Sequence, residues 1–177
     1  MKRRLISSEL DAVELEQAVV RSASKALRQI ADLHNASDVL RTLWSMKFRP
    51  IGCDPLDSEI PLNIIEQINQ TFTYIASARA ARTLLKMHPE FAPLTLNLGN
   101  IAGTDIESAH GNGLACEVFA AVNSSNNRKL AKDIAKVAKA DAGNKYVFFM
   151  CPGVSEGRQP TMERIHGIQV WSVGGEV

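Results

Sequence analysis

Apolar residues in the first half of the chain recur every three or four positions, which is the period of an amphipathic helix. The spacing predicts three helices, at residues 8–33, 37–46 and 61–88. Pro61 suits the first position of the third helix, where a missing N–H leaves no hydrogen bond unmade. Two prolines and a glycine make residues 48–57 a loop. Residues 1–92 are therefore expected to form a helical N-terminal segment.

From residue 93 onward the pattern changes to that of β-strands, with alternating or continuous apolar residues between glycines and prolines. The predicted strands are 94–98, 104–107, 114–122, 146–151 and 168–173. Between the third and fourth strands, Leu130, Ile134 and Val137 mark one face of a helix that ends near residue 140. A strand, a helix and a strand in succession imply a parallel crossover. The predicted fold class is therefore α/β, a mixed sheet in residues 93–177 with flanking helices, on which the N-terminal segment packs as one compact domain.

Composition narrows the class of protein only slightly. At 177 residues, 45% hydrophobic and 22% charged, the chain can bury a full core, and the net charge of +1 excludes an overall polycationic surface. No signal peptide or membrane span is apparent, and three scattered cysteines favour neither a zinc site nor a disulfide framework, so we expect a cytoplasmic protein. Basic residues still gather on the helix after the third strand: Arg128, Lys129, Lys132, Lys136 and Lys139.

Two carboxylates are the best functional candidates. Asp105 lies on the second predicted strand, and Glu117 lies within the apolar third strand. Residues 109–113 contain glycines and an asparagine, which favour a hairpin turn that would bring the two acids side by side. A buried carboxylate is unfavourable unless a cation or a proton donor compensates it. The pair therefore suggests a divalent-metal site.

Simpler interpretations stand beside this one. Asp105 and Glu107 suit exposed acids at a strand end, and Glu117 suits a structural salt bridge to a lysine or arginine. The lysine-rich helix suits a solvated face. The phosphate-binding patterns G-x-x-x-x-G-K-[ST] and G-x-G-x-x-G after a strand are absent, which argues against a nucleotide-binding loop. The G-x-S-x-G nucleophile motif is also absent, which argues against a serine hydrolase.

The order of strands and acids over residues 93–173 resembles the PD-(D/E)XK nuclease superfamily, which has the restriction-endonuclease-like fold. Asp105 matches the aspartate of the family's second strand, and Glu117 matches the acid of its third strand. Thr104 stands where the family often has proline. The main departure is Phe119, which occupies the position of the family's lysine and lies on the same face of the strand as Glu117.

The resemblance implies a metal-dependent endonuclease of restriction or defence type that hydrolyses DNA with Mg²⁺, with Mn²⁺ as the alternative metal. Asp105 and Glu117 would ligate the metal, with Glu107 as a third ligand. Lys129 or Lys132 would supply the positive charge of the family's lysine, which Phe119 replaces. The rival interpretation is a catalytically inactive nuclease-fold protein that binds nucleic acid or a partner protein. In either case the helices at 8–33 and 61–88 have apolar faces wide enough to form a homodimer.

Overall fold

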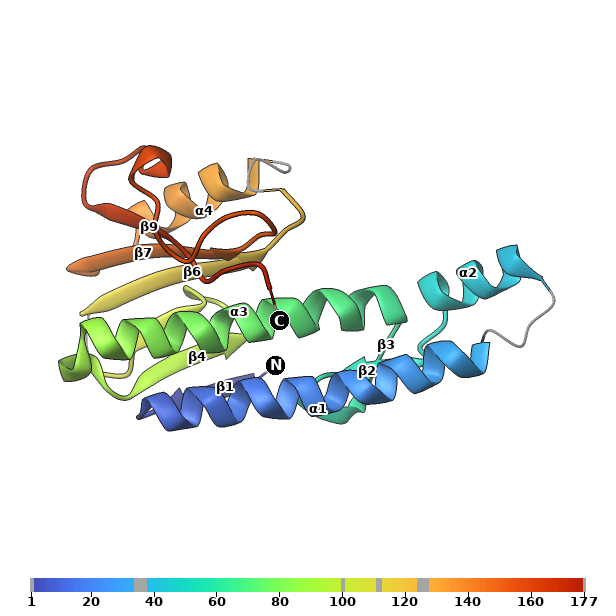
Figure 1. The fold of residues 1–177 in the computed structure, drawn as a ribbon. Coiled ribbons are helices and arrows are strands. Elements are labelled where there is room, and N and C mark those ends of the chain that lie inside the picture. Colours follow the sequence, from blue (N-terminus) through green and yellow to red (C-terminus); the bar gives the residue numbers. More distant parts are fainter. Residues whose placement is uncertain (1, 34–37, 100, 111–112, 124–127, 177) are drawn as a thin grey trace. The chain divides into compact units, whose positions relative to one another are not determined.

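The computed structural model describes residues 2–33, 38–99, 101–110, 113–123 and 128–176 (Figure 1). The chain separates into two compact units. The first contains residues 1–13 and 76–177, and the second contains residues 14–75. The two long helices have residues in both units, and each unit is described by itself below.

The first unit is built on one mixed sheet with the strand order β1–β4–β5–β6–β7–β9–β8. Its strands are β1 (Lys2–Ile6), β4 (Leu94–Leu98), β5 (Ile106–Ser108), β6 (Leu114–Ala120), β7 (Asn144–Met150), β8 (Gly157–Arg158) and β9 (Ile168–Ser172). Neighbours from β1 to β6 are antiparallel, whereas β6, β7 and β9 run parallel, and β8 is antiparallel to β9. The predicted mixed α/β sheet is confirmed.

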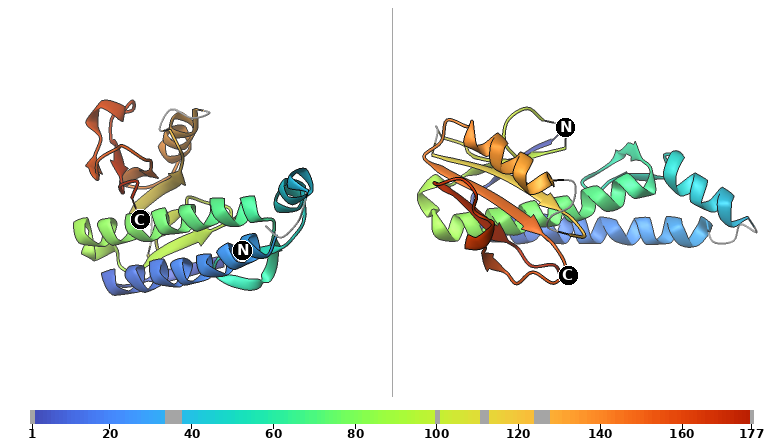
Figure 2. Two further views of the ribbon diagram at one scale, coloured as in Figure 1. Left: turned by 45° about the vertical axis from the view of Figure 1, so that its right-hand side comes forward. Right: turned by 90° about the horizontal axis from the view of Figure 1, so that it is seen from above.

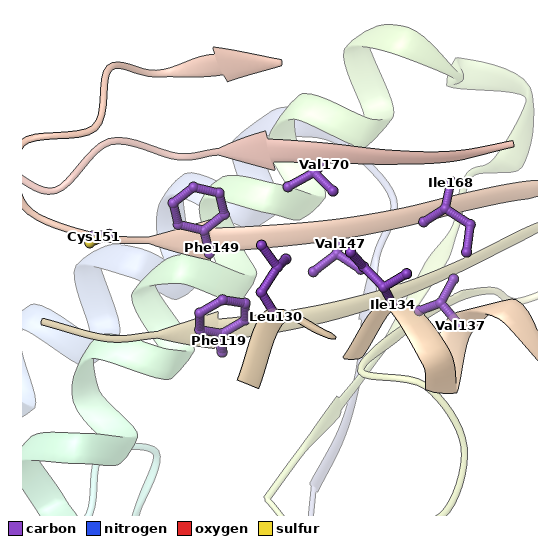
Figure 3. Packing of buried hydrophobic residues seen from close by; sticks show 9 residues of the cluster. All are labelled: Phe119, Leu130, Ile134, Val137, Val147, Phe149, Cys151, Ile168 and Val170. Carbon is purple, nitrogen blue, oxygen red and sulfur yellow. The ribbon is translucent and has the colours of Figure 1, made fainter. Parts of the chain in front are cut away.

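Helix α4 (Lys129–Ala138) connects β6 to β7 and packs on one face of this sheet. It buries Leu130, Ile134 and Val137 against side chains of β6, β7 and β9, including Phe119 and Phe149 (Figure 3). These helical residues are the ones whose spacing predicted the apolar face. Burying an apolar side chain of this size contributes about 1.5–3 kcal/mol, so the cluster fixes α4 on the sheet.

The opposite face of the sheet is covered by helix α3 (Ile64–Met87), from Ala76 to its end (Figures 1 and 2). Ala76, Ala80 and Ala81, in this part of α3, are fully buried. After α3, a short 3-10 helix η1 (Pro89–Phe91) leads into β4, and a second, η3 (Pro160–Met162), precedes β9.

The second unit contains most of helix α1 (Glu9–Leu33), helix α2 (Val39–Phe48), the first part of α3 and a two-stranded hairpin. The hairpin strands are β2 (Gly52–Asp54) and β3 (Asp57–Leu62). Two hydrogen bonds connect the hairpin to α3. The Cys53 N–H donates to Gln67 Oε1 at 3.1 Å, and the Tyr74 hydroxyl donates to Asp54 Oδ2 at 3.0 Å.

All three predicted helices of the N-terminal segment exist, but the segment is not wholly helical. β1 was missed because it consists mainly of basic residues, which an edge strand accommodates on its solvated side. The hairpin was missed because its prolines favoured a loop. Pro61 lies in β3 opposite Cys53 rather than in the helix, which begins at Ile64 behind the capping side chain of Asn63.

The predicted strands of the second half are confirmed, with ends that differ by a few residues, and only the two-residue β8 was not expected. β5 begins one residue after Asp105. The predicted turn residues 111–112 and the start of the second helix at residue 37 lie outside the described residues. Within the described residues, every helix is too short or too polar to cross a membrane.

Candidate functional site

Asp105 and Glu117 occupy facing positions on neighbouring strands. Ile106 pairs with Cys116 and Glu107 with Ala115, so the same antiparallel register places Asp105 opposite Glu117. Facing residues of an antiparallel pair carry their side chains on the same side of the sheet, about 5 Å apart at Cβ. Because β5 starts only at residue 106, the Val118 N–H donates instead to Asp105 Oδ2 at 2.8 Å. The register thus places Asp105 and Glu117 on neighbouring strands, as the sequence predicted.

Helix α4 brings two lysines and a third carboxylate to the same face. Lys136 donates a hydrogen bond to Glu117 Oε2 at 2.9 Å, and its Nζ lies 2.8 Å from Oε1. Lys129 donates to Asp133 Oδ1 at 2.6 Å. Residues four and three apart lie on one side of a helix, which is why positions 129, 133 and 136 act together. Both lysines are about half exposed, whereas Glu117 and Asp133 are buried.

Burial dominates the ionisation of these acids. Desolvation and the neighbouring charge of Asp105 raise the pKa of Glu117 to about 7, against the opposing effect of Lys136. Desolvation also raises the pKa of Asp105 and of Asp133. Burial alone would lower the pKa of Lys136, but its hydrogen bond to Glu117 and the nearby carboxylates raise it above its ordinary value. The mutual effects show that these groups form one electrostatic cluster.

Phe119 lies at the edge of this cluster and belongs to the apolar core. Its ring stacks on Phe149 with centroids 5.7 Å apart, as Figure 3 shows. The Lys129 ammonium lies 5.9 Å from the centroid of the Phe119 ring. The position that carries lysine in the resembling family is therefore filled by a core side chain. Positive charge reaches the carboxylates from α4 instead.

Glu107 is bound to the residues of the preceding turn and to Asn97. Its Oε1 accepts hydrogen bonds from the Thr104 N–H at 2.8 Å and from Asn97 Nδ2 at 3.2 Å. Gly103 has φ of 110°, and a Cβ at this position would overlap the Glu107 carboxylate. The glycine thus makes room for Glu107 to fold back over the turn. In this arrangement Glu107 stabilises the turn before it. The sequence had suggested Glu107 as a third metal ligand.

The lysines differ from the sequence expectation in their roles. Lys129 reaches the cluster but is bound to Asp133, and Lys132 is exposed, with no ion pair or hydrogen bond among the described residues. Lys136 is the residue that contacts Glu117. Sequence reasoning missed Lys136 and Asp133 as site residues, and the available signal was their helical spacing relative to Lys129. It also missed Asn97, a polar residue in a strand whose neighbours Leu96 and Leu98 are buried.

The site retains polar atoms that suit a cation. Oδ2 of Asp133 and Oδ1 of Asn97 are buried and receive no hydrogen bond within the described part of the chain, whereas both Glu117 oxygens lie within 2.9 Å of Lys136 Nζ. In the same part, no three His, Cys, Asp or Glu side chains are arranged to hold a metal ion. A cation here would therefore bind two carboxylates together with other oxygens and water, as Mg²⁺ commonly does.

The geometry defines a class of site: a buried carboxylate, Glu117, that faces the partly buried Asp105, with lysines supplied by a crossover helix. Comparisons with models of known protein families, with curated proteins and with solved structures find no match to this chain.

Proposed function

We propose that the protein is a metal-dependent endonuclease of the PD-(D/E)XK superfamily with the restriction-endonuclease-like fold. The order α3, β4, β5, β6, α4 and β7 supports this, since it gives a helix, three antiparallel strands, a crossover helix and a parallel strand. The observation that carries the proposal is the facing pair Asp105 and Glu117 with Lys136 bound to Glu117.

Asp105 and Glu117 would hold Mg²⁺ or Mn²⁺. Glu117 fits this assignment because it is a buried carboxylate that needs a cation or a proton to compensate it. The half-exposed Lys136 ammonium that lies against both of its oxygens can give way to the metal. When bound, the cation would hold a phosphate oxygen and lower the pKa of an attacking water. The raised pKa of Glu117 agrees with a site that lacks one positive charge.

Lys136 takes the place of the lysine that the strand lacks. Its half-exposed ammonium can release Glu117 and contact a phosphate, where it would stabilise the negative charge that develops during hydrolysis. Asp133 holds Lys129 next to it on the same face of α4. The chain thus offers two ammonium groups beside the carboxylates, without any contribution from position 119.

Double-stranded DNA is the proposed substrate, and restriction or defence is the proposed context. Five basic residues of α4 and its start are exposed around the site, and such side chains neutralise backbone phosphates. They are Arg128, Lys129, Lys132, Lys136 and Lys139.

The second candidate is a catalytically inactive protein that binds nucleic acid on the same scaffold. Phe119 favours it, because the core occupies the motif position. In that case the Lys136–Glu117 pair only holds α4 on the sheet, and the Lys129–Asp133 pair only stabilises the helix itself. Both candidates predict DNA binding, so cleavage is the measurement that separates them.

The decisive experiment incubates the full chain with supercoiled plasmid in Mg²⁺, Mn²⁺ or EDTA. Glu117→Ala and Lys136→Ala are expected to reduce cleavage at least about a hundredfold, as loss of a charge-stabilising group does. Lys47→Ala removes an exposed lysine of α2 instead; it is the matched control and is expected to retain most of the cleavage. Equal cleavage by wild type and Glu117→Ala would identify a contaminant. DNA binding without cleavage in either metal would favour the inactive candidate.

Pairing of two copies through the helices at 8–33 and 61–88 stays a prediction. Val20 and Leu27 of α1 and Ile68 and Phe72 of α3 are exposed in the second unit and would be covered in such a dimer. Sedimentation of wild type beside Leu27→Glu tests it, since a charge in an apolar interface disfavours association.

A further inference from the structure

We propose that Asn97 is an oxygen ligand of the cation held by Asp105 and Glu117. The inference rests on the proposed metal site and adds a neutral amide oxygen to it. It also replaces the ligand set suggested by sequence, in which Glu107 was the third member.

The amide of Asn97 has a fixed orientation. Its Nδ2 donates to the Thr104 carbonyl oxygen at 2.7 Å and to Glu107 Oε1 at 3.2 Å. Both N–H groups of the amide are thereby used. If Oδ1 and Nδ2 were exchanged, Oδ1 would lie against two other hydrogen-bond acceptors. Oδ1 is therefore the end of the amide that remains for another partner.

The position of Asn97 directs it to the carboxylate pair. The Asn97 N–H donates to the Asp105 carbonyl at 2.8 Å, and the β4–β5 register places the two residues opposite each other. Asp105 faces Glu117 in turn. One row across three strands thus presents an amide oxygen and two carboxylates on the same face, which is the mixture of oxygen types that hard cations bind.

Asn97 Oδ1 needs a partner that the described residues do not provide. The residue is only 6% exposed, and Oδ1 receives no hydrogen bond from the described part of the chain. A buried acceptor without a donor costs about 1–3 kcal/mol. A cation, or a water bound to it, would remove this deficit.

Glu107 then has a supporting role. It accepts from Asn97 and from the Thr104 N–H, and Gly103 leaves space for its carboxylate. Such outer contacts hold a ligand in one orientation, and their loss commonly weakens metal binding about 10- to 100-fold. The segment 103–107 therefore fixes the orientation of the Asn97 amide, so that Oδ1 is directed toward the cation.

The test measures Mn²⁺ binding to the full chain by calorimetric titration, together with thermal unfolding in EDTA and in excess Mn²⁺. Asn97→Ala removes the oxygen and is expected to weaken Mn²⁺ binding about tenfold or more. Asn97→Asp keeps an oxygen and adds charge, so it should bind Mn²⁺ at least as tightly as wild type. In EDTA it should unfold at a lower temperature, because it cannot donate to Thr104. Asn144→Ala is the matched control, since it also removes an amide bound to a backbone carbonyl.

The outcomes separate this inference from the proposed function. Weak binding by Asn97→Ala and retained binding by Asn97→Asp support the ligand. Equal weakening in both variants would assign Asn97 a structural role and overturn the inference. Wild-type binding by Asn97→Ala, with loss in Glu117→Ala, would overturn the inference and leave the metal site intact. A wild-type protein that binds no Mn²⁺ and cleaves no DNA would overturn both.

Discussion

The face of the sheet on which α4 packs has two halves, one lined by apolar side chains and one lined by polar side chains. Under α4, Phe119, Val147 and Phe149 pack into a closed apolar cluster (Figure 3). Across β4, β5 and β6, the same face carries Asn97, Asp105 and Glu117, and the buried Oδ1 of Asn97 lacks a donor within the described residues. The first half stabilises the fold by burying apolar surface. The second half holds polar groups whose burial is unfavourable, which is the expected character of a binding or catalytic site.

Removing a side chain from the apolar half should have the largest effect on stability. Phe149 is fully buried, so Phe149→Ala is expected to lower the free energy of unfolding by about 3–5 kcal/mol through lost burial and a cavity. Urea unfolding followed by circular dichroism measures this. Leu5→Ala, at an exposed position of β1, should change it by less than about 0.5 kcal/mol. Similar losses for both would mean that the cluster does not hold α4.

Moving a charge into the apolar half should have the next largest effect. Phe119→Lys restores the residue type of the resembling family, but it places an ammonium under α4 and removes the ring that stacks on Phe149. We expect a loss of about 2–4 kcal/mol in the same urea titration, mainly from desolvation. Phe119→Leu keeps the site apolar and should lose about 1 kcal/mol. A Phe119→Lys protein as stable as wild type would show that this position is open to the carboxylates and to solvent.

The polar half should make stability depend on pH. The folded protein keeps the Glu117 proton up to about pH 7, whereas the unfolded chain releases it near the ordinary value of 4.5. Between these values the folded state binds more protons, so the free energy of unfolding falls as pH rises and levels off above about 7. We expect a fall of about 1–3 kcal/mol from this group in EDTA.

Glu117→Gln supplies the control for that pH dependence, because an amide does not titrate. The variant should lose most of the fall between pH 5 and 7 and should exceed wild type in stability at pH 8. Urea titrations at three pH values are sufficient. An unchanged slope in Glu117→Gln would show that another group is responsible.

The smallest expected effect on stability comes from breaking the Lys136–Glu117 ion pair, which links α4 to the polar half. Lys136→Met removes the cation bound to Glu117. Because Lys136 is about half exposed and its charge is screened by water, the loss at pH 8 should be only about 1 kcal/mol, and it should disappear at pH 5 where Glu117 is protonated. Lys132→Met should have no measurable effect at either pH. A loss that does not depend on pH would indicate lost packing of the Lys136 stem instead.

The sequence predicted the fold well wherever periodicity was strong. Leu130, Ile134 and Val137 marked the buried face of α4, the alternating residues of β4 marked that strand, and a continuous apolar run marked β6. β1 was hidden because its basic residues at a sheet edge carry no apolar pattern. The prolines around β2 and β3 concealed that hairpin, since Pro61 suits a helix start as well as a strand at the edge of a sheet.

The candidate site was predicted as far as its strand residues. Asp105 and Glu117 meet because strand register follows from the hairpin between them. The helical partner could not be chosen from sequence, because Lys129, Lys132 and Lys136 differ only in how α4 is rotated on the sheet. That rotation is set by packing of the apolar cluster. Asn97 was missed because its Oδ1 is available to a cation only when other residues accept hydrogen bonds from its Nδ2. The sequence does not show which residues do so.

β1 has a consequence for how this protein forms during synthesis. Lys2 pairs with Leu98, so the strand leaves the ribosome long before β4, with which it pairs, and α1 to α3 are made in the interval. Until β4 emerges, the nascent strand has an open backbone edge. Arg3 and Arg4 give that edge positive charge, which discourages pairing with strands of other nascent chains.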